Sequence, residues 1–120
     1  MKESLDVLKW IEFAERDLQI ARRMISEYPD DSAFHSQQAA EKALKAVLIK
    51  KSGELIKTHE LAFLAKHVKA PAEIVSECVD LNELSVSMRY PGADEVIGEY
   101  TPEKAVKAAE KVLSWSKKQI

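Results

Sequence analysis

The stretch that decides the fold runs from residue 32 to residue 52 and reads SAFHSQQAAEKALKAVLIKKS. Its small and aliphatic residues recur at steps of three and four, which is the spacing of one helix face. Gly53 follows directly and suits the position just after a helix end. The sequence therefore predicts a long helix from about Ser32 to Ser52. Its expected core positions are Ala40, Ala43, Leu44, Val47 and Leu48.

Four further segments repeat the helical spacing on both sides of this stretch. They are expected from about Ser4 to Glu27, Glu60 to Lys69, Pro71 to Met88 and Thr101 to Lys118, with Thr58, Pro71, Thr101 and Pro102 as starting signals. The residues expected to face inward are Leu8, Ile11, Ala14, Leu18, Ala21, Ile25 and Tyr28 in the first segment, Leu61, Leu64, Ala65 and Val68 in the third, Ile74, Cys78, Leu81, Ser85 and Met88 in the fourth, and Ala105, Ala109, Val112 and Leu113 in the fifth.

No segment alternates with the period of a strand, so the expected class is all-α. Long helices joined by short turns pack as antiparallel neighbours. We therefore expect one domain over residues 1–120, an antiparallel up-and-down bundle of four main helices plus one short helix. The segment from Pro91 to Tyr100 is the longest irregular stretch, and long loops often carry function.

The amino-acid composition indicates which broad classes of protein the chain can belong to. Hydrophobic residues make up 46% and charged residues 32% of the 120 positions, and no run approaches the ~20 apolar residues of a membrane span. The start of the chain lacks the apolar region of a secretion signal. A single cysteine, Cys78, excludes an internal disulfide and fits a reducing compartment, so a cytoplasmic location is expected.

Charge and motifs exclude several kinds of site. The net charge of −2 and a pI near 5.9 rule out a global basic footprint for nucleic acid, although a local basic patch stays open. His35, His59 and His67 lack the spacing of a metal-binding pair, so no metal is expected. The chain contains no glycine-rich phosphate loop of the GxxxxGK[ST] or GxGxxG type. Cys78 lies in a core stripe and is expected to be unreactive.

One face of the second helix needs an explanation. His35, Gln38, Glu41, Lys42 and Lys45 share about a third of the helix circumference. The simplest interpretation is a solvated face on which Glu41 and Lys45 form a helical ion pair at i,i+4. Two large apolar residues lie on the same side, however, which favours a dimer or partner interface. These residues are Phe34 and Ile49. An error in the expected helix boundary would also explain Phe34.

Three other places carry candidate polar residues. Lys57, Thr58 and His59 open the third helix, where free backbone N–H groups would accept an anion; the alternative is ordinary capping with His59 packed on a neighbour. Arg89 and Tyr90 stand at the expected end of the fourth helix. One interpretation is an arginine that binds phosphate beside a tyrosine ring that stacks on a base. The alternative is a cation near the helix C-terminus and an aromatic ring that covers the end of the bundle. Asp17 lies near the inner side of the first helix and is expected to pair with a second-helix lysine or His59; otherwise it is a surface charge.

Four sequence motifs together resemble the HEPN domain family over essentially the whole chain. The motifs that carry the resemblance are Trp10, Ala14, Asp17, Leu18 and Ala21 in the first helix, QAAEKALKA at residues 38–46, KTHEL at residues 57–61 and RYP at residues 89–91. The resemblance implies a prokaryotic helical bundle that dimerises through its first long helices. It also implies a place beside a small nucleotidyltransferase in a toxin–antitoxin-like module, and nucleotide binding by likeness to the helical domain of kanamycin nucleotidyltransferase.

Other family members are metal-independent ribonucleases with an arginine followed, after four to six residues, by histidine. Here Arg89 is followed at those positions by Asp94, Glu95 and Val96, and the arginines of the first helix lack a spaced histidine too. The longer form of this motif, with a tyrosine that the partner transferase modifies, is therefore also missing.

The sequence leaves three hypotheses. The first is a non-catalytic homodimeric subunit that binds a nucleotide such as ATP, or a nucleotidyltransferase chain, without any other cofactor. The second is a ribonuclease toxin with a divergent site, and the third is a purely structural dimerisation module. Enzyme activity and nucleic-acid binding stay open. The residues assigned to the nucleotide or partner site are Gln38, Glu41, Lys42, Lys45, Lys57, Thr58, His59, Arg89 and Tyr90.

Overall fold

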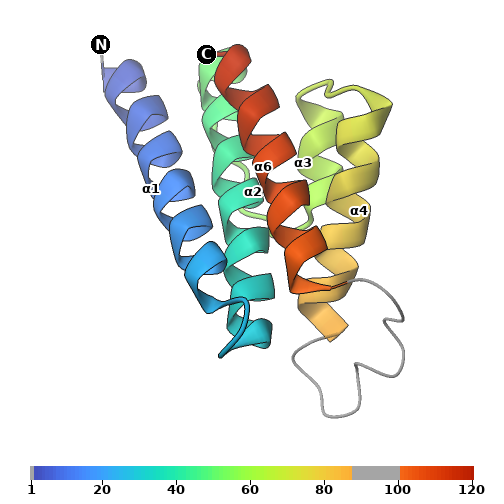
Figure 1. Cartoon of the computed structure of the whole chain (residues 1–120). Helices are drawn as coiled ribbons and strands as arrows, with labels where there is room; N and C mark the ends of the chain where they lie inside the picture. The colour runs from blue at the N-terminus through green and yellow to red at the C-terminus, as the bar shows by residue number, and fades with distance from the viewer. Residues whose placement is uncertain (1, 88–100) are drawn as a thin grey trace.

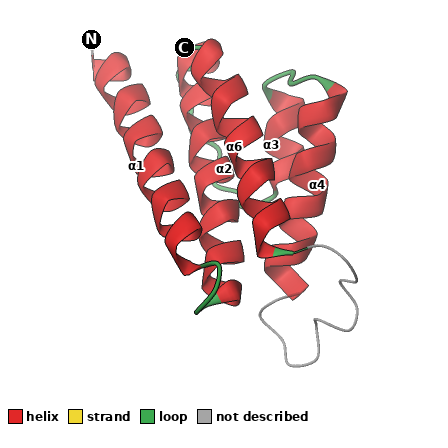
Figure 2. Ribbon diagram, in the orientation of Figure 1, coloured by secondary structure: helices red, strands yellow, loops and turns green. Residues whose placement is uncertain are grey.

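The computed structural model describes the backbone of residues 2–87 and 101–120, and the side chains of residues 6–83 and 101–120. Within these ranges the chain forms five helices and no strand (Figure 1, Figure 2). The helices are α1 (Lys2–Met24), α2 (Pro29–Ser52), α3 (Leu61–His67), α4 (Ala72–Ser87) and α6 (Pro102–Lys118). The all-α bundle of four long helices and one short helix predicted from the sequence is confirmed.

The long helices run alternately down and up, so that α1 and α2, and likewise α4 and α6, are antiparallel (Figure 1). The helix α2 occupies the centre and contacts all four of the others. Because of this central place, α2 is covered on nearly every side, and thirteen consecutive positions from residue 37 to residue 49 include only two that are not buried. The consequence is that polar side chains of α2 are carried into the interior.

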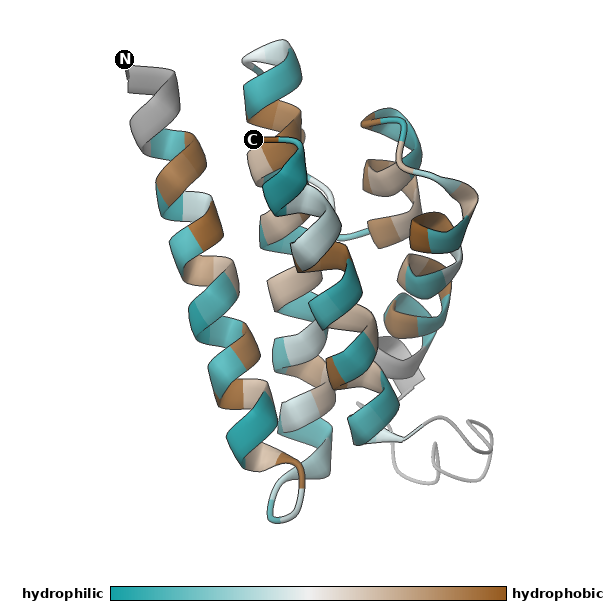
Figure 3. Cartoon of the chain, turned by 45° about the horizontal axis from the view of Figure 1, so that its top comes forward, coloured by the Kyte–Doolittle hydropathy of each residue, from teal (hydrophilic) through white to brown (hydrophobic). Residues whose placement is uncertain are grey.

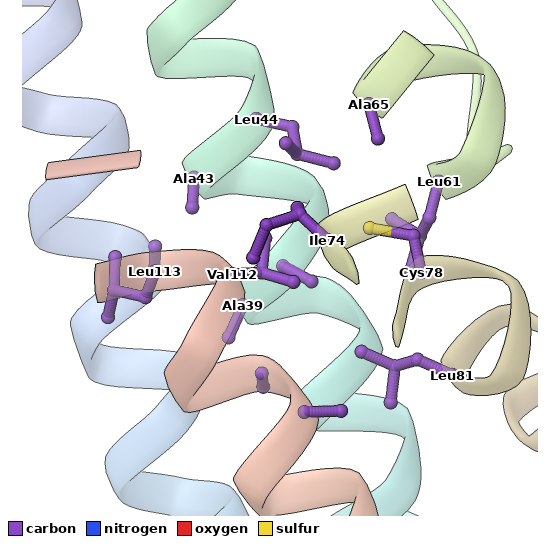
Figure 4. Packing of buried hydrophobic residues seen from close by; sticks show 14 of the residues in the cluster. Ala39, Ala43, Leu44, Leu61, Ala65, Ile74, Cys78, Leu81, Val112 and Leu113 are labelled. Atoms are coloured by element: carbon purple, nitrogen blue, oxygen red, sulfur yellow. The ribbon is translucent and has the colours of Figure 1, made fainter. Parts of the chain in front are cut away.

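A single large hydrophobic core joins the helices (Figure 4). Alanines on α2 allow its neighbours to approach closely, and large aliphatic side chains of α3, α4 and α6 fill the remaining space. The expected inward positions of α2, α3 and α6 and the first three of α4 are buried as predicted. A smaller cluster of Val7, Ala46 and Ile49 packs the N-terminal end of α1 against the C-terminal end of α2, with Trp10 and Ile11 packed on it.

The helix ends follow the expected chemistry in two places. Gly53 has a φ of 73°, in the left-handed region that glycine tolerates best, and its N–H donates to the Ile49 carbonyl at 2.8 Å. Thr101 is the N-cap of α6, where its hydroxyl accepts from the Lys104 N–H at 3.3 Å, and Pro102 follows at the first helical position. Both ends are therefore set by local sequence.

Several boundaries differ from the prediction. The helix α2 begins at Pro29 rather than Ser32, because proline is favoured in a first helical turn. Ser32 is consequently inside the helix, where its hydroxyl donates to the Ala21 carbonyl of α1 at 2.7 Å. The helix α1 ends at Met24 rather than Glu27, and α4 begins at Ala72, one residue after Pro71.

Some inward assignments were wrong. Leu8 and Tyr28 are 59% and 57% exposed. Val7 takes the buried position that Leu8 was expected to fill, and Tyr28 lies beyond the end of α1, where the helical register no longer applies. Ser85 and Met88 have side chains outside the described part of the structure. None of the helices in the described ranges is both long and apolar enough to cross a membrane.

Candidate functional site

The polar side of α2 is not a solvated face. Glu41 and Lys45 are only 4% and 7% exposed. Their predicted i,i+4 ion pair is present, with Lys45 Nζ 2.9 Å from Glu41 Oε2. What the helical wheel could not reveal is that α1 and the segment before α3 cover this side of the central helix. A buried ion pair requires further hydrogen bonds to offset the loss of hydration.

Those further contacts are present around Glu41. His59 Nδ1 lies 3.0 Å from Oε1 and 3.2 Å from Oε2, and Gln37 Nε2 donates to Oε1 at 3.2 Å. Trp10 of α1 covers the cation, with Lys45 Nζ 5.7 Å from the ring centroid. We call Gln37, Glu41, Lys45 and His59 the Glu41 cluster. It joins α2 to the segment between α2 and α3.

The geometry fixes the hydrogen-bonding role of His59. A carboxylate only accepts hydrogen bonds, so the ring nitrogen that faces Glu41, Nδ1, must carry a proton. The His59 side chain is 83% exposed, which leaves the rest of the ring facing solvent. His59 therefore contacts Glu41 through one ring nitrogen and, among the described residues, does not pack on a neighbouring side chain.

A second cluster surrounds Asp17 of α1, whose side chain is 9% exposed. Lys42 Nζ lies 2.5 Å from Asp17 Oδ2, and His35 Nδ1 lies 2.9 Å from Oδ1. The ring of Phe13 stands beside the cation, with its centroid 6.0 Å from Lys42 Nζ. This Asp17 cluster of Asp17, His35 and Lys42 repeats the pattern of the Glu41 cluster, in which one buried carboxylate accepts from one lysine and faces one histidine.

The expected partner of Asp17 is thus confirmed as a second-helix lysine, while His59 pairs with Glu41 instead. Sequence reasoning missed Gln37 and the pairing of Asp17 with His35. The i,i+4 spacing of Gln37 and Glu41 was an available signal. The Asp17–His35 contact joins residues 18 apart on two helices, and only their packing creates it.

The surface beside the Asp17 cluster is partly aromatic. Phe13 is 45% exposed and Phe34 is 38% exposed, and Phe34 meets the His35 ring edge-on with 5.5 Å between centroids. A shallow groove between α1 and α2 is lined by Phe13, Arg16, Asp17, Ile20 and Lys42. We call the side that carries this groove and Phe34 the α1/α2 face. Ile49, which was expected to flank an interface, is 8% exposed and is covered by α1.

The remaining predicted residues divide into three groups. Gln38 is half-buried on α2. Lys57 is exposed before α3, and Thr58 does not cap that helix, since Glu60 occupies the N-cap position and the Thr58 hydroxyl accepts from the Glu60 N–H at 3.2 Å. Arg89 and Tyr90 lie outside the described residues.

The structure therefore brings Glu41, Lys45 and His59 together. It places Lys42 in the separate Asp17 cluster. In the described part of the chain no group of three or more histidine, cysteine or acidic side chains could hold a metal ion. Burial raises the pKa of the Cys78 thiol to about 12, and the nearby Glu77 carboxylate adds to the shift, so this cysteine stays protonated in the core.

The fold and these clusters define an α-helical bundle protein with two buried carboxylates, Glu41 of the central helix and Asp17 of α1, each of which contacts a lysine of the central helix and a histidine. The family model of the HEPN domain matches residues 7–120. The chain belongs to the HEPN domain family.

Known proteins agree with this assignment. A protein of Methanocaldococcus jannaschii named "Putative toxin MJ1304" is 34% identical over 125 residues, covering 87% of this chain and 81% of that protein. The crystal structure of ST0689, described as an archaeal HEPN homologue, is 33% identical with a TM-score of 0.75 and covers 94% of this chain and 96% of its own. TT1696 from Thermus thermophilus shares the fold, with a TM-score of 0.80 at 23% identity over 95% of this chain and 98% of its own.

Proposed function

We propose that this chain is the HEPN subunit of a toxin–antitoxin-like module and that it acts by binding a protein partner, a small nucleotidyltransferase. The observation that carries the proposal is the state of the second-helix lysines. Lys42 and Lys45 are both neutralised by carboxylates of the same chain. A lysine must be unpaired to hold a phosphate strongly, so these contacts favour a protein partner over a nucleotide as the ligand.

The α1/α2 face suits such a partner. It offers the exposed ring of Phe13 beside the charged side chains of Arg16, Asp17 and Lys42. Aromatic residues and arginine are enriched in protein interfaces, and a few such anchors supply most of the binding energy. In this proposal the chain is also a homodimer, and its two copies leave the α1/α2 face open to the transferase.

Association of purified chains tests the proposal. The tagged chain would be co-expressed with the small nucleotidyltransferase of the same genome, and the complex isolated by affinity and size-exclusion chromatography. Phe13→Ser is expected to weaken association by about 30-fold or more, the effect of losing an interface anchor worth ~2 kcal/mol.

Phe63→Ser is the matched control, because Phe63 is 46% exposed on α3 and Phe13 is 45% exposed on α1. The proposal would be wrong if the wild-type chain and transferase elute apart. It would also be wrong if both serine variants bind equally well.

A second candidate function, a ribonuclease toxin with a divergent site, is favoured by one contact. Glu41 holds the proton on His59 Nδ1, which leaves Nε2 of an exposed ring available to accept a proton from a ribose hydroxyl. The relative named as a toxin supports this hypothesis. His59→Ala would then abolish growth arrest on expression, and Glu41→Gln would weaken it.

Arg89→Ala tests whether that site also needs the arginine after α4. Lys66→Ala, an exposed change on α3, serves as the control. Growth arrest that persists in all three site variants would rule out a ribonuclease built on these residues.

A further inference from the structure

The outer side of α6 carries a straight row of lysines that neither cluster uses. Lys104, Lys107, Lys111 and Lys118 are all exposed. Their spacings of three, four and seven residues place them on one helical stripe about 21 Å long, interrupted by the exposed Ser114. We call these four lysines the α6 stripe. Figure 3 shows hydrophilic residues recurring along the C-terminal helix α6, between hydrophobic ones.

The stripe stands out against the charge of the whole chain. The helix α6 holds five lysines and two glutamates, a net charge of +3, whereas the chain as a whole carries −2. Glu110 is engaged by Arg22 of α1 at 2.7 Å, and therefore does little to neutralise the stripe. The positive charge is concentrated on one helix.

Three of the four stripe lysines have no acidic partner among the described residues. Lys111 Nζ lies 3.1 Å from Glu77 Oε1 of α4, but its side chain is 54% exposed and the pair is open to solvent. Lys104, Lys107 and Lys118 form no ion pair within residues 6–83 and 101–120. This contrasts with Lys42 and Lys45, whose charges are satisfied inside the chain.

A groove runs beside the stripe between α4 and α6. Pro71, Ile74 and Trp115 form its apolar part, Lys107, Lys111 and Lys118 supply three cations, and Glu73 and Glu110 supply two carboxylates. The Trp115 ring is half-buried, with Lys51 Nζ 5.7 Å from its centroid. The cations that line the groove outnumber its carboxylates, and a groove of net positive charge that follows the backbone is one element of single-strand binding surfaces.

We propose that the α6 stripe and this groove bind single-stranded nucleic acid through its phosphodiester backbone. Lysine is depleted in protein interfaces, while it is a common point-charge partner of phosphate. A row of lysines one helical turn apart matches a line of phosphates along one strand better than it matches a compact acidic protein. The ligand is recognised by charge, so little sequence preference is expected.

The salt dependence of binding measures the number of phosphate contacts. For single strands the logarithm of the binding constant falls by about 0.7 per contact for each tenfold rise in salt. Four contacts from the α6 stripe predict a slope of about 3. Removing three lysines should lower the slope by about 2 and weaken binding roughly a hundredfold at 0.1 M salt.

The experiment is fluorescence anisotropy of a labelled 15-nucleotide single-stranded RNA, titrated with the full chain between 20 and 200 mM salt. The test variant is K104Q/K107Q/K118Q. The matched control is K9Q/K50Q/K66Q, which removes the same charge from exposed positions on α1, α2 and α3. Circular dichroism melting checks that both variants remain folded.

The expected result is a slope near 3 for the wild type and the control and near 1 for the stripe variant. Absence of RNA binding at 20 mM salt would overturn the proposal, as would an equal loss in the control variant. Competition by polyglutamate as effective as that by unlabelled RNA would instead identify the stripe as a surface for acidic proteins. Tighter binding to duplex RNA than to the single strand would refute the assignment to single strands.

Discussion

Replacing Glu41 or Lys45 singly should destabilise the protein far more than replacing both. With 4% and 7% exposure, these residues form a buried pair, and removing one partner from such a pair costs about 3–5 kcal/mol. Among the described side chains, Glu41→Leu leaves the Lys45 ammonium with only the Trp10 ring, so its cost should fall near the upper end. Lys45→Met leaves Glu41 with His59 and Gln37, so its cost should fall near the lower end.

The double variant Glu41→Leu/Lys45→Met removes both charges and keeps side chains of similar volume. Its unfolding free energy should lie within about 1 kcal/mol of the wild type, since hydrophobic replacement of a buried pair is often neutral or stabilising. Urea denaturation at pH 7, followed by circular dichroism, gives the free energy of each variant. A double variant destabilised by the sum of the single effects would refute the coupling, because additive losses indicate independent residues.

Three further predictions concern stability and reactivity. Gly53→Ala should lower the unfolding free energy by about 1 kcal/mol in urea denaturation, because φ is 73° there; an unchanged value would show that the left-handed turn relaxes. Thr101→Ala should lower the unfolding free energy by ~1 kcal/mol through loss of the α6 cap. Thr101→Ser, as the control, should retain most of the stability that the cap contributes. The Cys78 thiol, with its pKa raised to about 12 by burial, should resist a thiol reagent at pH 8 in the native protein and react in urea. Because the thiol ionises at a lower pH in the unfolded chain than in the folded one, its contribution to the free energy of unfolding is lost as pH rises from about 9 towards 12. Fast labelling of the native protein would contradict the buried placement.

Much of the fold could be predicted from local sequence. The stripe on α2, the glycine after it and the Thr101–Pro102 start of α6 each specify a structure within a few residues, and all three appear as expected. The start of α2 was placed late, because the first turn from Pro29 is polar and lies outside the apolar pattern that marks the helix. Likewise Leu8 and Val7 are adjacent, and spacing alone could not decide which one faces α2.

The sequence placed three polar residues of the candidate site on one side of α2, but it could not give their environment. A helical wheel places Glu41, Lys42 and Lys45 on one polar side and so suggests exposure to water. Burial of that side depends on α2 being the central helix, which is a property of the tertiary packing. The separation of the lysines into two clusters follows from where Asp17 and His59 arrive from other parts of the chain.

This separation changes the balance between the hypotheses. A nucleotide site made from Lys42 and Lys45 would have to break two ion pairs before it could hold a phosphate. A protein partner can dock on the α1/α2 face with both clusters intact.

Isothermal titration calorimetry of the purified chain, first with the small nucleotidyltransferase and then with ATP, tests the central claim most directly. We expect saturable binding to the transferase at micromolar or lower dissociation constant and no measurable binding of ATP to the isolated chain. Micromolar ATP binding that disappears in Lys42→Ala, together with no heat from the transferase, would contradict the account and restore the second-helix lysines as a nucleotide site.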